Sequence, residues 1–147
     1  MRVLRLVFVS LTLVYGQSDS ENRSKPATKS GETIPVGETD LRVVRRGEQI
    51  LSDETKWNRK DNRVCPENAT TWSLYCALYK ASVEINGKFD HRLGALEEVR
   101  RNVEQASKGK NYNHRLMGYN NDPSTKFADI LKVLRTSEKT IAARLTP

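Results

Sequence analysis

The sequence predicts an all-α protein, a compact bundle of about four helices. From about residue 40 onward, apolar residues recur at spacings of three and four, the period of a helix that buries one face. No segment alternates apolar and polar residues as a half-buried strand does. The chain has 147 residues, the size of one domain, and helices over residues 39–147 can enclose a modest core.

Residues 1–16 have the features of a secretory signal peptide. Arg2 and Arg5 form a basic start, an apolar run covers residues 6–14, and Gly16 suits the position before a cleavage site. The apolar run is shorter than the ~20 residues that a membrane-spanning helix needs. We therefore expect export, either secreted or periplasmic, with no transmembrane anchor after cleavage. The alternative is a cytoplasmic protein with a mis-assigned start.

Residues 17–38 are polar, and only Ala27, Ile34 and Val36 among them are aliphatic. Such a segment has too little apolar surface to offset the entropy lost on folding. It is predicted to be a flexible spacer, so the helical domain is expected to cover residues 39–147.

The first predicted helix starts at Asp40, a residue type that caps helices, and ends between Glu54 and Trp57. Its buried face follows a three-four spacing: Val43, Val44, Gly47, Ile50 and Leu51. The polar stretch 58–63 is predicted to be a loop.

The second predicted helix covers residues 69–85, with Asn68 as its cap and Asn86-Gly87 as its stop. Apolar residues occupy most of its circumference, which is typical of a central helix. Its aromatic residues Trp72, Tyr75 and Tyr79 fall at helical spacing and are expected to belong to the core.

The third predicted helix starts at Asp90 and ends at residues 108–110, and the fourth follows Asp122-Pro123. Their buried stripes are Leu93, Leu96, Val99, Val103 and Ala106 in the third, and Phe127, Ile130, Leu131, Leu134, Ile141 and Leu145 in the fourth. Residues 108–121 are predicted to form a long loop between them.

Cys65 and Cys76 are the two cysteines of the chain. In an exported protein they can form a disulfide, but only if residues 65–68 fold back along the second helix; two separate thiols are the alternative. Asn22 and Asn68 lie in N-glycosylation patterns, which a eukaryotic secretory route would use.

The candidate binding residues lie near the starts of the last two predicted helices. They are His91, Arg92, His114, Arg115, Tyr119, Asn120, Asn121 and Asp122. Capping alone explains Asp122 and Pro123, so Tyr119, Asn120 and Asn121 are the residues of this turn that a site would use. The two histidines can meet only if the loop 108–121 travels back along the domain.

Several function classes have no support in the sequence. It contains no nucleophile elbow, P-loop or dinucleotide fingerprint, and its histidines and cysteines do not have metal-ligand spacing, so neither a cofactor nor a metal is predicted. The net charge is +7, or +5 without the leader, and no dense basic block occurs, so a nucleic-acid partner is not expected.

The leading hypothesis is a binding or interaction module for a small molecule or a protein. One alternative is a small hydrolase or transferase that pairs Asp122 with His91 or His114. Another is weak binding to anionic surfaces through Arg42, Arg45 and Arg46.

The order of features from Leu41 to Leu145 resembles a family of small bacterial and phage domains of unknown function. The residues that carry the resemblance are Trp57, the helix Trp72-Ser73-Leu74-Tyr75-Cys76-Ala77-Leu78 and the turn before the last helix, Asn120-Asn121-Asp122-Pro123. The resemblance implies a small, mostly helical domain, and it implies no activity, catalytic residue or cofactor. The turn lacks the extra residue that the family has before proline.

Overall fold

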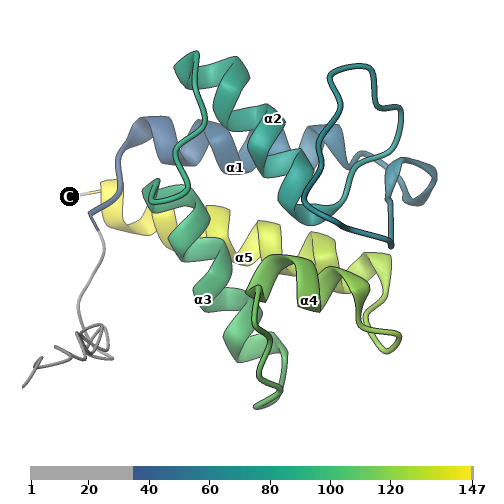
Figure 1. Ribbon diagram of the computed structural model, residues 1–147. Helices are drawn as coiled ribbons and strands as arrows, with labels where there is room; N and C mark the ends of the chain where they lie inside the picture. Colours follow the sequence, from purple (N-terminus) through teal and green to yellow (C-terminus); the bar gives the residue numbers. More distant parts are fainter. Residues whose placement is uncertain (1–34, 147) are drawn as a thin grey trace, which may run out of the picture. The chain divides into compact units, whose positions relative to one another are not determined.

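The computed structural model describes residues 35–146, which form five α-helices and one short 3-10 helix, with no strand among them (Figure 1). The predicted leader and residues 17–34 of the predicted spacer lie outside the described residues. The helical elements are α1 (Glu38–Ile50), η1 (Glu54–Lys56), α2 (Leu74–Asn86), α3 (Gly94–Ala106), α4 (Arg115–Asn121) and α5 (Phe127–Leu145).

The longest helix, α5, contacts both α1 and α3 and so joins the two sides of the domain. Helix α2 lies against α1, while the short helix α4 lies against α3 and α2 (Figure 1). Most of the large side chains that are fully buried between these helices are aliphatic, among them Leu51, Leu74, Leu78, Leu96, Ile130, Leu134 and Ile141. Burial of each such side chain contributes about 1.5–3 kcal/mol of transfer free energy, which makes this core the main source of stability.

The prediction of an all-α fold is confirmed, but four helices are one too few. The predicted loop 108–121 contains α4, a helix of seven residues. Its apolar residues are too few to form the repeated stripe that reveals a longer helix. Its polar residues Asn120 and Asn121 are also of a type that is common in turns. In the structure their side chains contact other segments of the chain, which are described below.

Three predicted helix starts were wrong, each in the same way. Helix α2 begins at Leu74, capped by the Ser73 hydroxyl, which accepts from Cys76 N at 3.1 Å. Helix α3 begins at Gly94 rather than at Asp90, and α5 begins at Phe127 rather than after Asp122. In each case the polar residue mistaken for a cap lies in the preceding turn.

Asp40 links two helices and takes part in the cap of α1 from inside the helix, not as the residue before it. It is the third residue of α1, and its carboxylate accepts from Gly37 N at 2.9 Å and from Ala95 N at 2.6 Å. The second bond satisfies a backbone donor in the first turn of α3 that has no partner within its own helix. The start of α1 and the start of α3 are therefore held together by one side chain.

Among the helices of residues 35–146, none combines the length and the apolar character that crossing a membrane requires.

Candidate functional site

Residues 57–72 form a loop that closes on itself at two tryptophans. Trp72 N donates to Lys56 O at 2.7 Å, and Asn58 N donates to Trp72 O at 3.0 Å, so the chain enters and leaves the loop side by side. Both tryptophan side chains are buried, and Trp57 contacts the ring of Phe127 on α5. The loop is therefore anchored to the core at its neck.

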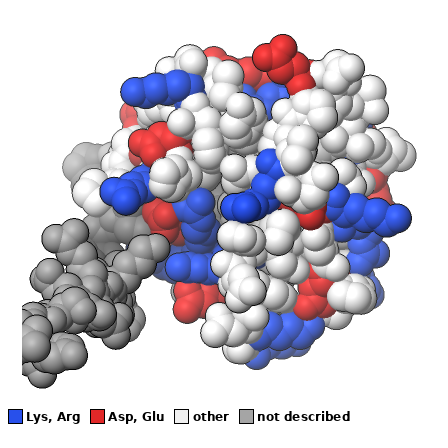
Figure 2. All heavy atoms as spheres, viewed as in Figure 1, with Lys and Arg blue, Asp and Glu red and all other residues white. Residues whose placement is uncertain are grey.

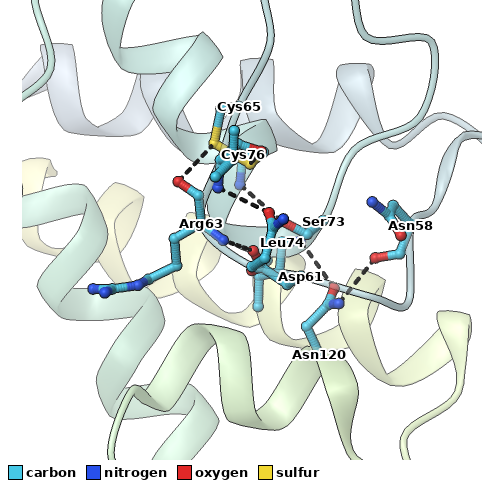
Figure 3. Close-up of a disulfide and its surroundings, with 10 residues drawn as sticks. Asn58, Asp61, Arg63, Cys65, Ser73, Leu74, Cys76 and Asn120 are labelled. Carbon is cyan, nitrogen blue, oxygen red and sulfur yellow. Dashed lines mark hydrogen bonds between the residues drawn. A yellow bond between two sulfur atoms is a disulfide. The ribbon is translucent and has the colours of Figure 1, made fainter.

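Asn120, at the end of α4, connects this neck to the rest of the domain (Figure 3). Its Oδ1 accepts from Trp57 Nε1 at 2.8 Å and from Leu74 N at 3.0 Å, and its Nδ2 donates to Asn58 O at 2.9 Å. The side chain is fully buried. A buried amide with this many partners has a structural role, and no group remains free to contact a ligand.

Asn121 holds the same loop one residue further on. Its Oδ1 accepts from Asp61 N and its Nδ2 donates to Asp61 O, both at 2.8 Å. The side chain of Asn121 thus bonds both the N–H and the C=O of Asp61, as the backbone of a neighbouring β-strand would. The predicted site residues Asn120 and Asn121 are thus explained by their contacts to the loop.

Cys65 and Cys76 are joined by a disulfide, with their Cα atoms 5.3 Å apart (Figure 3). From the sequence, the disulfide was one of two alternatives, because the helix predicted to start at residue 69 would have placed Cys76 well inside it. Helix α2 starts at Leu74, so Cys76 lies in its first turn, and the extended chain before it brings Cys65 within reach. Asn68 lies in an exposed turn closed by Ala69 N to Pro66 O and does not cap α2.

The carboxylate of Asp122 accepts its hydrogen bonds from residues that are near in the chain. Its Oδ2 accepts from Lys110 Nζ and Tyr112 Oη, both at 2.8 Å, and its Oδ1 accepts from Ser124 N at 2.8 Å. These bonds, led by the one from Lys110, hold the pKa of the carboxyl well below its usual range. Asp122 therefore stays ionised and organises the turn between α4 and α5.

His91 and His114 do not meet in the structure. His91 precedes the first turn of α3, whereas His114 precedes α4, and its neighbour Arg115 pairs with Glu104 near the other end of α3. A 13-residue helix is about 20 Å long, so the two histidines lie at opposite ends of it. Arg92 lies with His91, and within residues 35–146 neither histidine is a partner of Asp122.

The arginines of α1 are largely paired with acids. Arg45 contacts Glu138 at 2.7 Å, and Arg46 contacts Glu84 at 2.6 Å, while Arg42 is exposed. On the face seen in Figure 2, basic and acidic side chains alternate and no large patch of one sign forms. These contacts do not favour the alternative of an anionic-surface binder.

A groove of about 650 Å³ lies between the end of α3, the segment before α4 and the start of α5. Most of the residues that line it have polar side chains: Asn102, Gln105, Ser107, Lys108, Lys110, Tyr112, Tyr119, Ser124, Thr125, Asp129, Lys132 and Thr136. This volume falls in the range of small-molecule sites, about 300–1,000 Å³. Tyr119 is the member of the predicted site set that lines it.

Three groove residues are nearly buried, yet each has a polar atom with no protein partner within residues 35–146. Asn102, Tyr119 and Thr125 are 6%, 5% and 4% exposed. The Asn102 amide nitrogen donates to Ser137 Oγ at 2.9 Å and to Glu98 O at 3.1 Å, which leaves its Oδ1 unpaired. The Tyr119 and Thr125 hydroxyls are likewise without a protein partner. Each of these three atoms is accessible to solvent although its residue is nearly buried, so each can bond water or a ligand that enters the groove.

Burial raises the pKa of Tyr119 to about 12, and the carboxylates of Asp129 and Asp122 add to the rise. Burial also raises the pKa of Tyr112 to about 12, together with its bond to Asp122. Both hydroxyls are therefore protonated at neutral pH. The Tyr119 hydroxyl can donate a hydrogen bond into the groove, whereas the Tyr112 hydroxyl already donates to Asp122.

The sequence pattern did not reveal Asn102, Thr125 or Lys132 as groove residues. They lie on three separate segments, and no spacing in the sequence brings them together. Among the described residues, no group of three His, Cys, Asp or Glu side chains is arranged to hold a metal ion.

The fold and groove define a small, disulfide-bridged, all-α domain. The chain belongs to a family of unknown function, DUF6197, whose model matches residues 35–140. The match agrees with the resemblance found in the sequence at the level of a family of unknown function. No curated protein and no solved structure shows significant similarity to the chain.

Proposed function

We propose that this chain is an exported binding domain that takes a small polar molecule in the groove between α3, α4 and α5. The observation that carries the proposal is the set of unpaired polar atoms on Asn102, Tyr119 and Thr125. These atoms are open to the groove, so a ligand that replaces the water on all three can gain about 0.5–1.5 kcal/mol from each hydrogen bond.

A binding role has more support than an enzymatic one. The Asp–His pairing that a small hydrolase or transferase would use is replaced by the contacts of Asp122 to Lys110, Tyr112 and Ser124. The Tyr119 hydroxyl, protonated at neutral pH, is suited to donate a hydrogen bond rather than to act as a base.

The binding proposal is tested by a ligand-observed NMR screen of the full chain against a defined library of sugars, sugar acids, amino acids and nucleosides. We expect at least one class of compound to bind. Its binding should weaken strongly in the double variant Tyr119→Phe/Thr125→Val. This variant removes two hydroxyls that have no protein partner, so the thermal stability of the fold should be nearly unchanged.

Tyr79→Phe is the matched control, because Tyr79 packs against Phe89, 4.8 Å away between ring centroids, and does not line the groove. It should bind the same compounds as the unaltered chain. Hits that bind the double variant equally well, or a library without any hit, would contradict the proposal.

Export is supported by the signal-like leader and by the disulfide, since disulfides persist in oxidising compartments. The intact mass of the protein from its native host tests it. We expect a chain that begins at Gln17 and lacks two hydrogen atoms because of the disulfide. A chain that retains residues 1–16 with two free thiols would exclude export.

A further inference from the structure

The charges on the groove are unequal. Lys108, Lys110 and Lys132 line it, against the single carboxylate of Asp129. Lys110 is neutralised by Asp122 at 2.8 Å, but Lys108 and Lys132 make no ion pair within residues 35–146. The Asp129 carboxylate also has a hydrogen-bond partner within the protein, because its Oδ2 accepts from Lys126 N at 2.9 Å. The groove therefore has a net positive charge from two exposed, unpaired ammonium groups.

The Asn102 side chain, which lines the groove, sets a second requirement for the ligand. The Oδ1 atom of Asn102 is an acceptor only, since a carbonyl oxygen has no hydrogen to give. Its orientation is fixed by the bonds that the same amide makes to Glu98 and Ser137. A ligand must therefore supply a hydrogen-bond donor here. Acetate and sulfate have none, so a bare anion would leave this atom unpaired.

We infer that the ligand of this groove is a small anion that also carries hydroxyl groups, of the chemical class of sugar acids. Its carboxylate would lie near Lys108 and Lys132, and its hydroxyls would bond Asn102, Tyr119 and Thr125. A volume of about 650 Å³ accommodates a molecule of this size. The inference rests on the proposed function and specifies its ligand class.

The test compares four probes in NMR titrations of the ¹⁵N-labelled full chain: glucuronate, glucose, glucosamine and acetate. Glucuronate should bind about tenfold more tightly than glucose, as two exposed charge contacts allow, and glucosamine and acetate should bind most weakly. The preference for glucuronate over glucose should fall at high salt, because exposed charges are screened.

Two lysine variants on α5 provide a matched pair. Lys132→Gln should weaken glucuronate binding about threefold and leave glucose binding unchanged. Lys139→Gln removes an equally exposed lysine of the same helix that does not line the groove, and it should change neither.

The outcomes separate the inference from the proposed function. Equal affinity for glucose and glucuronate, with binding still dependent on Tyr119, would overturn the anionic ligand class and leave a binding groove in place. Acetate binding as tightly as glucuronate would overturn the requirement for hydroxyls. No binding by any of the four probes, together with hits of another class in the library screen, would likewise overturn the inference alone.

Discussion

Asn120 and Asp122 lie two residues apart in one polar turn, yet they serve different segments. Asn120 is buried and bonds the neck of the 57–72 loop, while Asp122 bonds Lys110, Tyr112 and Ser124. The sequence identified this turn as unusual but could not separate the two roles. Residue type shows which bonds a side chain can make, whereas the position of its partners, distant in the chain for Asn120 and near for Asp122, comes from the fold.

Replacement of Asn120 tests its structural role. Asn120→Ala leaves Trp57 Nε1, Leu74 N and Asn58 O without partners, and each loss costs about 1–3 kcal/mol. We expect the free energy of unfolding in urea to fall by about 3–5 kcal/mol. Asn113→Ala, at an exposed asparagine, should change it by less than about 0.5 kcal/mol. A loss below about 1 kcal/mol for Asn120→Ala would contradict the assignment.

Asp122 makes stability depend on pH in a predictable direction. Its pKa is lowered in the folded state, so its contribution is present above the unfolded value of about 3.9 and disappears as the pH falls through the lower, folded value. Asp122→Asn should therefore be less stable than the unaltered chain at neutral pH, and the difference should shrink below about pH 4. Thermal unfolding from neutral pH down to acid measures it, and a difference that stays constant would contradict the role.

At the scale of elements, the long helices were easier to predict than the segments between them. Leu96, Val99 and Val103 reveal α3 because their spacing repeats over several turns. The helix starts were harder, because Asp40, Asn68, Asp90 and Asp122 all belong to a residue type that also forms turns. Ser73 is the actual cap of α2, and its sequence offers no signal that distinguishes it from the nearby polar residues.

Gly118 lets α4 approach the segment before it. A Cβ at this position would lie 2.6 Å from Cβ and Cγ of Tyr112, too close for any real contact. Alanine normally stabilises a helix by about 1 kcal/mol relative to glycine, but we expect Gly118→Ala to lower the free energy of unfolding by about 1–2 kcal/mol through this clash.

A double-variant cycle isolates the clash. When Tyr112→Gly has removed the whole side chain, including its Cβ, Gly118→Ala should become stabilising, as in an ordinary helix. Urea unfolding of the four proteins provides the comparison. The same destabilisation with and without the Tyr112 side chain would show that the clash is not the cause.

At the scale of the whole molecule, the prediction of an all-α domain was correct because it depends on periodicity, which the sequence displays from about residue 40 onward. The groove could not be predicted in the same way. Its unpaired atoms come from Asn102 on α3, Tyr119 on α4 and Thr125 before α5, and the approach of these segments is a property of the assembled core. Only Tyr119 stood out in the sequence.

The disulfide contributes to the position of the 57–72 loop, and through this loop to helix α4 and the groove. Through the bonds of Asn120 and Asn121, the bridged loop supports α4, which carries Tyr119. Cys65→Ser/Cys76→Ser should lower the free energy of unfolding by about 2–3 kcal/mol. It should also speed hydrogen exchange at the α4 amides more than at α3. Uniform acceleration in both helices would indicate that the bridge stabilises the domain without a special effect on α4.

The bridge also changes what a cut in the backbone would do. Residues 66–71 are mostly exposed and lie between Cys65 and Cys76. A protease that cleaves there would break the peptide chain but leave its two pieces covalently attached through sulfur. The nicked protein should run as one species on a non-reducing gel and as two fragments after reduction, and every residue that lines the groove would belong to the C-terminal fragment.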